Sequence, residues 1–326
     1  MKQHYIPRCY LRRFSNNKKC IYTYDKMLCK QYNASMMSVC CEDDLYTMSD
    51  EYVSSNNEEG NSNIDNLSIE KGHFAETVEP FLSQLLNQID EVKDDWMSGK
   101  DYYRLNHAEK KKLALHIVTQ YFRLPQIGDS MVDDYLRMEK AGLDMIKHIL
   151  AVQTGNDEFR KLEVGIKCEK PALHANLSYL NDETLMSFAE AIANNIYVFG
   201  VSQDKNFYTS DFPIVVSPHV EDVRPMYMGL AQYGGELTMP LSPEIVLSVY
   251  DRDYFNDKES VDGCFIKADA KEVRRQNLMR YYYASRHVFS YKNDFCLIDF
   301  SYRLFGKHIF MKPNLSSKIV SGLGRY

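Results

Sequence analysis

The chain has 326 residues, of which 44% are hydrophobic and 26% charged, and its formal net charge is −6. This balance is typical of a folded globular protein and excludes general disorder, and the acidic excess argues against a protein that coats nucleic acid by bulk electrostatics. There is no C-x-x-C pair, no apolar signal-peptide core and no apolar stretch near the roughly 20 residues that cross a bilayer. We therefore expect a cytoplasmic protein with reduced thiols and no membrane contact.

The N-terminal segment, residues 1–47, is predicted to hold a basic stretch followed by a β-hairpin. Two β-rich runs, residues 19–26 and 32–39, alternate apolar and polar side chains, with an Asp-Lys break between them that begins at Asp25. Residues 48–66 are polar and acidic with few apolar anchors, so we expect a mobile loop there.

Residues 67–194 are predicted to form a helical block. In its first part, apolar residues recur mostly at three- and four-residue spacing, which is typical of an amphipathic helix. Asn106 followed by Glu109 is the pattern of a capping box, and Pro125 is expected to end the helix that begins there. The expected helices span residues 69–89, 106–124, 130–152 and 181–192.

Residues 195–326 are predicted to be rich in strands, with one late helix. Asp269 with Glu272 repeats the capping-box pattern and predicts a helix that continues to Ser285. The N-terminal hairpin and the C-terminal strands are expected to form a mixed or antiparallel sheet, with the helical block inserted between them. The sequence thus predicts an α+β fold in a single composite domain, residues 1–326. The expected strands are residues 196–201, 212–216, 245–250 and 295–302.

Several short motifs occur in order along the chain. The pieces are residues 4–14 (HYIPRCYLRRF), Ile69-Glu70 with Val78-Glu79, Gln120-x-x-Arg123-x-Pro125, residues 209–213 (TSDFP), residues 240–243 (PLSP) and Asn277. Together they resemble a mostly bacterial family known as domain of unknown function 4238, which opens with His-Tyr-Val-Pro followed by Tyr-Leu-Arg-x-Phe. Ile6 in place of valine, and Phe212 inside the Ser-Asp-x-Pro motif, are departures from that pattern. The resemblance spans nearly the whole chain and implies no activity.

The first 19 residues concentrate positive charge. Arginine binds phosphate or carboxylate bidentately, and His4 in the same segment can exchange protons near neutral pH. This pattern predicts an anion site. The alternative is that the arginines pair with the surplus carboxylates of the chain and that His4 donates to a backbone carbonyl. The segment has no acidic side chain, and its cations are Lys2, Arg8, Arg12, Arg13, Lys18 and Lys19.

Two further motifs carry polar groups whose role the sequence leaves open. Ser210 and Asp211 lie in a turn, where they either cap the local backbone or hold a carboxylate for a metal or a general base. Gln120 and Arg123, one turn apart near a helix end, either reach an anionic ligand or complement the helix dipole. Glu70 is the favoured carboxylate partner for an N-terminal arginine.

The leading hypothesis is a metal-dependent enzyme that acts on phosphodiester bonds, nuclease-like and of a defence or toxin type. His4, Glu70 and Asp211 would be catalytic, and Glu70 and Asp211 would also hold a divalent cation, Mg²⁺ or Mn²⁺. The phosphate-loop, Rossmann, H-E-x-x-H and G-x-S-x-G motifs are absent, so hydrolysis by a phosphate loop and dinucleotide binding are not expected. The ligand-binding residues would be Arg8, Arg12, Arg13, Gln120, Arg123 and Ser210.

Two alternatives use the same residues. The first is a non-enzymatic sensor or binding protein, in which the arginines bind an anionic small molecule or a peptide carboxylate. The possible partners of the chain are thus nucleic acid, for the nuclease-like enzyme, or an anionic ligand. The second is an interaction protein whose polar motifs only brace the fold. An enzyme needs His4 and a carboxylate at a shared open cleft, and a sensor needs cations in a pocket without such a base. A bracing role would bury the same groups in satisfied pairs.

Overall fold

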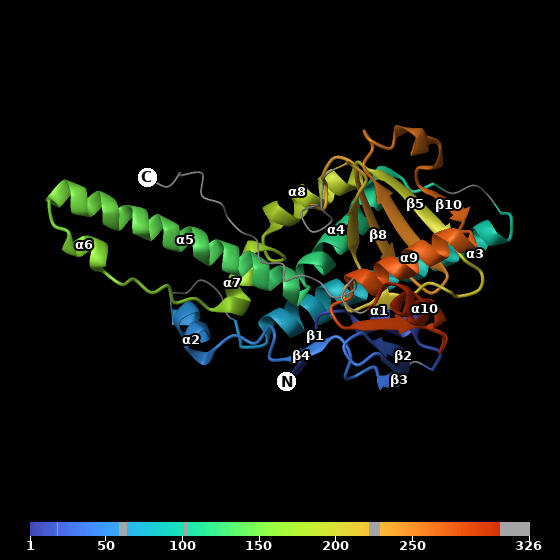
Figure 1. Ribbon diagram of the computed structural model, residues 1–326, viewed down its shortest axis with the longest axis horizontal. Coiled ribbons are helices and arrows are strands. Elements are labelled where there is room, and N and C mark those ends of the chain that lie inside the picture. Colours follow the sequence, from blue (N-terminus) through green and yellow to red (C-terminus); the bar gives the residue numbers. More distant parts are fainter. Residues whose placement is uncertain (18, 59–63, 101–103, 222–228, 307–326) are drawn as a thin grey trace.

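The computed structural model describes residues 1–17, 19–58, 64–100, 104–221 and 229–306 of the protein. The fold is α+β, as the sequence predicted. Figure 1 shows a body of sheets and helices from which helix α5 (Pro125–Thr154) extends outward on one side. Within the described residues, no helix has the length and apolar character that crossing a membrane requires.

The larger sheet has five strands and is mixed. Strand β10 runs parallel to β5, and the other neighbours are antiparallel. All six residues of β5 are buried, which fits its nearly continuous apolar sequence and its position between two neighbours. In spatial order the strands are β10 (Cys264–Lys267), β5 (Ile196–Val201), β9 (Ile245–Tyr250), β8 (Gly235–Pro240) and β7 (Val215–Pro218).

The second sheet is antiparallel and joins the two ends of the chain. The N-terminal hairpin pairs with the late strand β11, with Tyr24 opposite Val288. This confirms that the hairpin and a C-terminal strand share a sheet, although most of the C-terminal strands form the separate five-stranded sheet. In spatial order the strands are β3 (Lys30–Ser35), β2 (Cys20–Asp25), β11 (His287–Ser290) and β6 (Thr209–Ser210), and a third, two-stranded sheet pairs β1 (Lys2–His4) with β4 (Cys41–Asp43).

The helices cover the sheets and separate them. Helix α4 packs against α8, and α9 contacts strands of both larger sheets. Short helices α1 (Arg8–Leu11) and η1 (Arg12–Phe14) follow β1. The remaining helices are α2 (Asp50–Glu58), η2 (Ile69–Val78), α3 (Glu79–Met97), α4 (His107–Phe122), α6 (Glu158–Lys161), α7 (Lys170–Leu177), α8 (Asp182–Ala193), η4 (Asn256–Val261), α9 (Ala270–Tyr283) and α10 (Cys296–Phe305).

The helix starts that the sequence predicted from capping patterns are confirmed. The Asn106 side chain accepts from the backbone N–H of Glu109 at 3.0 Å, and the Glu109 carboxylate accepts from the backbone N–H of Asn106 at 2.9 Å. Asn181 caps α8 and Asp269 caps α9. Each of these side chains accepts a hydrogen bond from a backbone N–H three residues further on, at Thr184 and Glu272 respectively. Pro125 does more than end a helix, because it occupies the first turn of α5, where its missing N–H costs nothing.

Two predicted elements are wrong. The expected loop 48–66 contains helix α2, because Ser49 Oγ accepts from the Tyr52 backbone N–H and acidic residues occupy the first turn. Residues 59–63 of that segment lie outside the described residues. The expected strand 295–302 is instead mostly helix α10, whose buried residues recur at helical spacing.

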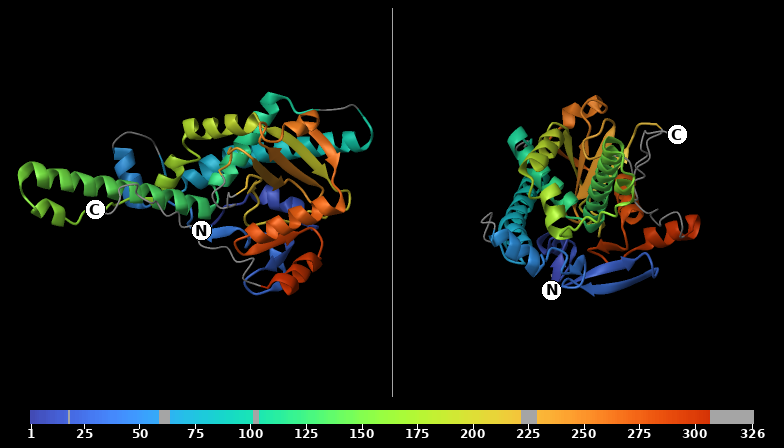
Figure 2. Two further views of the ribbon diagram at one scale, coloured as in Figure 1. Left: turned by 45° about the horizontal axis from the view of Figure 1, so that its top comes forward. Right: turned by 90° about the vertical axis from the view of Figure 1, so that its left-hand side faces the viewer.

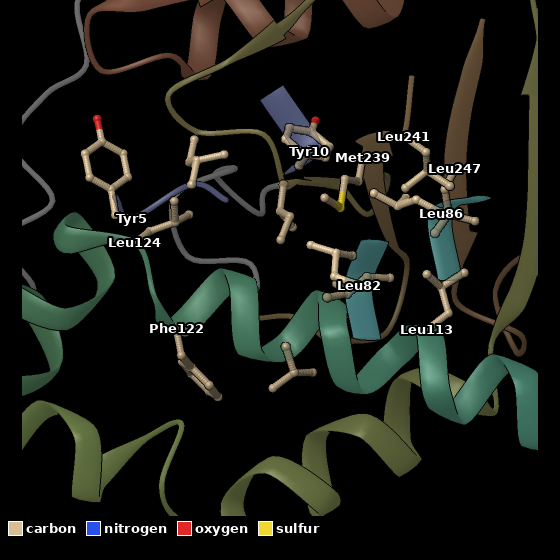
Figure 3. Close-up of a cluster of buried hydrophobic side chains, with 14 of the residues drawn as sticks. Tyr5, Tyr10, Leu82, Leu86, Leu113, Phe122, Leu124, Met239, Leu241 and Leu247 are labelled. Carbon is tan, nitrogen blue, oxygen red and sulfur yellow. The ribbon is translucent and has the colours of Figure 1, made fainter. Parts of the chain in front are cut away.

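Two cores hold these elements together. Figure 3 shows side chains of the N-terminal segment, α3, α4 and the five-stranded sheet converging in the main core. The second core, with Tyr24, Tyr281 and Phe295, lies between the four-stranded sheet and helices α9 and α10. Among the side chains labelled in Figure 3 are Tyr10, Leu82, Leu86, Leu113, Met239 and Leu247.

Candidate functional site

Helix η2 is a π-helix, and its winding determines which side chains share a face. A π-helix has roughly 4.4 residues per turn, against about 3.6 in an α-helix. Glu70, Phe74 and Glu79 are spaced by four and five residues, so π-helical winding places all three on one side. In an α-helix, Glu70 and Glu79 would point in opposite directions. The π-helix therefore directs two carboxylates and an aromatic ring toward Arg123.

Arg123 is fully buried directly after α4 and links three segments. Its Nη1 donates to Glu79 Oε1 at 3.0 Å, and its Nη2 donates to the carbonyl oxygen of His4 at 2.5 Å. Glu70 Oε2 lies 3.9 Å from Nη2, and the guanidinium carbon lies 3.9 Å from the centroid of the Phe74 ring. These contacts hold β1 and the π-helix against the end of α4.

The neighbouring motif residues are buried as well. One turn before Arg123, Gln120 Nε2 donates to the carbonyl oxygen of Tyr5 at 2.9 Å. Burial and the nearby Arg8 lower the pKa of His4, and burial raises the pKa of Glu70. His4 Nε2 and Glu70 Oε2 are buried and have no hydrogen-bond partner among the described residues. This environment favours a neutral imidazole away from solvent.

Asp211 is also buried, but its carboxylate serves another part of the backbone. Its Oδ1 accepts from the N–H of Ser285 at 2.8 Å, and its Oδ2 accepts from the N–H groups of Arg286 and His287 at 2.7 and 2.8 Å. Burial raises the pKa of Asp211, and the three backbone donors oppose that rise. Ser210 Oγ donates to a carbonyl oxygen two residues further on, at 2.9 Å. The Ser-Asp turn therefore fixes the start of β11.

The two carboxylates that were predicted to share a metal have different partners. Glu70 lies beside Arg123, whereas both oxygens of Asp211 are occupied by backbone N–H groups. Across the described ranges, no group of three or more His, Cys, Asp or Glu side chains could hold a metal ion. Each carboxylate instead lies beside donors from a distant part of the chain, as buried charges require.

The predicted N-terminal cations have different surroundings. Arg13 pairs with Asp90 of α3 at 2.6 Å, and Arg8 donates to a methionine sulfur at 2.7 Å. Arg12 is exposed. Lys18 lies outside the described residues. Neither the contact of Arg13 nor that of Arg8 involves Asp211.

A cavity of about 380 Å³ opens between three segments that are distant in sequence. The first is the loop between β5 and β6, the second is the start of α9, and the third is the loop between β11 and α10. Its volume is within the range of small-molecule sites. The side chains on which its chemistry depends are Asp204, Lys205, Asn206, Arg274, Lys292 and Asp294.

The three cations of the cavity have few carboxylate partners. Lys205 Nζ lies 3.8 Å from Glu244, which pairs more closely with another lysine at 2.6 Å. Lys292 Nζ donates to the amide oxygen of Asn206 at 2.9 Å. Exposed Arg274 makes no hydrogen bond and no ion pair with any residue that the structure describes. The cavity therefore presents positive charge that the surrounding protein neutralises only in part.

Asn277 of α9 gives the cavity its shape. Its Oδ1 accepts from the backbone N–H of Tyr208 at 2.8 Å, and its Nδ2 donates to the carbonyl oxygen of Asn206 at 2.8 Å. The Tyr208 hydroxyl donates to the carbonyl oxygen of Asp294 at 2.7 Å. Both loops are thus fastened to each other and to α9, so the lining side chains stand on a fixed backbone.

Comparison with known proteins places the chain in a family. The model of the family described as "Protein of unknown function (DUF4238)" matches residues 2–294 of the 326-residue chain. The chain belongs to this family. No curated protein and no solved structure matches it. The DUF4238 motifs that the sequence singled out lie in both regions: the opening and Gln-Arg motifs meet at Arg123, and Asn277 borders the cavity.

Sequence reasoning missed the cavity cations of this DUF4238 protein. Lys205, Arg274 and Lys292 are single charged residues in three separate segments, and only the tertiary fold brings them together. The sequence signal that could have pointed to these cations is their closeness to family motifs. Lys205 lies just before the Thr-Ser-Asp-Phe-Pro motif, and Arg274 lies one turn before Asn277. Neither fact identifies a binding residue by itself.

Proposed function

We propose that this protein binds a small anionic ligand, carrying phosphate or carboxylate groups, in the cavity between α9 and the two loops. The observation that supports this most directly is the gathering of Lys205, Arg274 and Lys292 around one cavity, with incomplete neutralisation by protein carboxylates. Arginine and lysine donors are the usual ligands of phosphate and carboxylate. The cavity cations thus form a local positive site in a chain whose net charge is −6.

The lining favours binding over catalysis. Asp204 and Asp294 also border the cavity, so a ligand with a hydrogen-bond donor beside its anionic group would match it best. Within the described residues, neither a histidine nor a cysteine lines it. A general base of moderate pKa is therefore missing from this lining, which is the feature expected of a sensor rather than an enzyme.

The metal-dependent phosphodiester-cleaving enzyme, nuclease-like and of a defence type, is the second proposal and has weaker support. It would need Glu70 and Asp211 to reach one Mg²⁺ or Mn²⁺ ion, and their present partners are an arginine and three backbone N–H groups. A cytoplasmic location is proposed with either function, because all eight cysteines are free thiols.

Ligand binding is tested by thermal shift and calorimetry with inorganic phosphate, citrate, adenosine monophosphate and a short single-stranded RNA. We expect at least one of the three small anions to raise the melting temperature, because a ligand that binds the folded state stabilises it. Arg274→Gln should weaken that binding by about 10- to 100-fold, the cost of one charge-assisted hydrogen bond.

Arg160→Gln is the matched control, because it removes the same charge from an exposed arginine of α6, outside the cavity. It should leave the affinity unchanged. If both variants weakened anion binding equally, the loss of affinity would come from the change in net charge, and the cavity would be rejected as the binding site. Binding of RNA alone, or its cleavage with Mg²⁺ or Mn²⁺ but not with chelator, would favour the nuclease proposal instead.

A further inference from the structure

Helix α5 extends well beyond the body of the protein. Its first turns are packed: Gly128 and Val132 are buried, and a Cβ added at Gly128 would meet the His174 ring of α7 at 2.3 Å. The rest of the helix projects from the body, as Figure 1 and the left view of Figure 2 show. We call residues 135–154 the arm, which is about 30 Å long at 1.5 Å per residue.

One side of the arm is covered by the chain that follows it. Leu136 and Leu143 are half-buried and Ala151 is buried. Lys147 Nζ donates to the carbonyl oxygen of Leu162 at 3.0 Å, which fastens the returning segment to this side. Among the residues that the structure describes, the arm therefore has partners on one face only.

The opposite face carries a row of exposed residues that we call the seam. Its spacing of three and four residues is the a/d pattern of a coiled coil. Met138, Met145 and Val152 are 67%, 66% and 63% exposed, which is unusual for apolar side chains on a charged helix. The seam consists of Tyr135, Met138, Gly142, Met145, Ile149 and Val152.

We propose that the seam pairs with the seam of a second copy of this chain, with the two arms antiparallel. With Ile146 and Leu150 beside it, the seam exposes roughly 700 Å² per arm, on the order of the 800 Å² that each partner buries in a standard interface. The exposed surface is thus large enough for a stable dimer. A symmetric interface of two identical patches is also the commonest form of protein assembly.

Side-chain size favours the antiparallel orientation. Centred between Gly142 and Met145, antiparallel arms place Gly142 opposite Met145 twice, and Met138 opposite Ile149 twice. A Cβ at Gly142 would meet nothing within 4 Å, so the space beside it is open to the flexible thioether of the second copy. Parallel arms would stack Gly142 on Gly142 and leave a gap in the seam.

Charge favours the same orientation. The flanks of the seam are acidic in the first half of the arm, at Asp134 and Glu139, and carry His148 and Gln153 in the second half. Antiparallel arms place each acidic half beside the other half of the partner. Parallel arms would place Asp134 of each copy beside Glu139 of the other, and this pairing of like charges is destabilising.

Sedimentation velocity of the full chain, over roughly two orders of magnitude in concentration, tests the pairing. We expect a dimer for the wild type and a loss of affinity of at least about tenfold for Met145→Glu. The variant should keep its helicity, and its thermal unfolding should match that of the wild type at concentrations where both are monomeric, since Met145 is exposed in the single chain. Lys140→Glu introduces the same side chain on the arm outside the seam and should leave the dimer intact.

Cysteine cross-linking tests the orientation. Under mild oxidation, Met138→Cys combined with Ile149→Cys should give a covalent dimer above the wild-type background. Within one chain these positions lie about 16 Å apart, beyond the roughly 7 Å reach of a disulfide. Cross-linking by Met138→Cys alone would indicate parallel arms and overturn the orientation. If the wild type sedimented as a monomer throughout, or if Met145→Glu still formed the dimer, the proposed pairing of the two seams would be wrong.

Discussion

Two groups of charged side chains in this protein are placed in opposite ways. Arg123 and Asp211 are buried, and each is tied to backbone groups or to an opposite charge. Around the cavity, Arg274 and Lys292 are exposed and only partly neutralised. The first group contains most of the family motif residues that the sequence drew attention to, and the second contains few.

The contrast teaches that a motif of polar residues need not mark chemistry. Gln120 and Arg123 satisfy carbonyl oxygens of the N-terminal segment, and Asp211 satisfies N–H groups at the start of β11. Such bonds matter because a buried polar group without a partner costs more than a typical bond contributes. We therefore expect these residues to govern stability, and the cavity cations to govern ligand affinity.

The largest expected effect on stability comes from Arg123→Met. The substitution leaves the carboxylate of Glu79 and the buried carbonyl oxygen of His4 without their donor. We expect the free energy of unfolding to fall by about 3 to 5 kcal/mol, the cost of breaking one side of a buried ion pair. Urea denaturation followed by circular dichroism measures it.

Arg137→Met on the exposed part of α5 is the control, and it should cost less than about 0.5 kcal/mol. A loss below about 1 kcal/mol for Arg123→Met would mean that the fold does not need this cation. Arg123 would then become a candidate ligand-binding residue again, and the contrast between the two regions would fail.

A smaller effect is expected from Asp211→Asn. The amide keeps one acceptor oxygen but turns a donor toward backbone N–H groups of residues 285–287. We expect the free energy of unfolding to fall by about 2 to 3 kcal/mol, and Asp133→Asn, exposed on α5, to change it by less than about 0.5 kcal/mol. Unchanged stability together with lost phosphodiester cleavage would instead support the catalytic role predicted for Asp211.

Structural features that depend only on residues close together in the sequence, such as helix caps, could be predicted from it. The capping pairs at Asn106 and Asp269 act within one helical turn, and both predicted helix starts are confirmed. The π-helix could not be predicted in this way, because the residue that its side chains face, Arg123, is distant in sequence. Its only local trace was the five-residue gap between Ile69 and Phe74.

Features set by distant segments were accessible only in part. The sequence predicted that the hairpin shares a sheet with C-terminal strands, but β11, the strand that pairs with the hairpin, was not among the expected strands. The division into two larger sheets accompanies packing around α9, which contacts strands of both. The strand expected at 295–302 failed because Phe295 and Ile298 face the second core at helical spacing. The cavity needed three segments at once, and no single one of them predicts it.

The smallest expected effect on stability is that of Arg274→Gln, and it sharpens the comparison most. This side chain is exposed and has no ion pair with any described residue, so its loss should change the free energy of unfolding by less than about 0.5 kcal/mol. Any gain in stability should shrink as salt is added, because it would come from relieving repulsion among the three cavity cations. Urea denaturation at low and high ionic strength measures both. If the free energy of unfolding fell by about 2 kcal/mol, Arg274 would be a structural cation like Arg123. Unchanged stability together with weakened anion binding would show that the two regions have different roles.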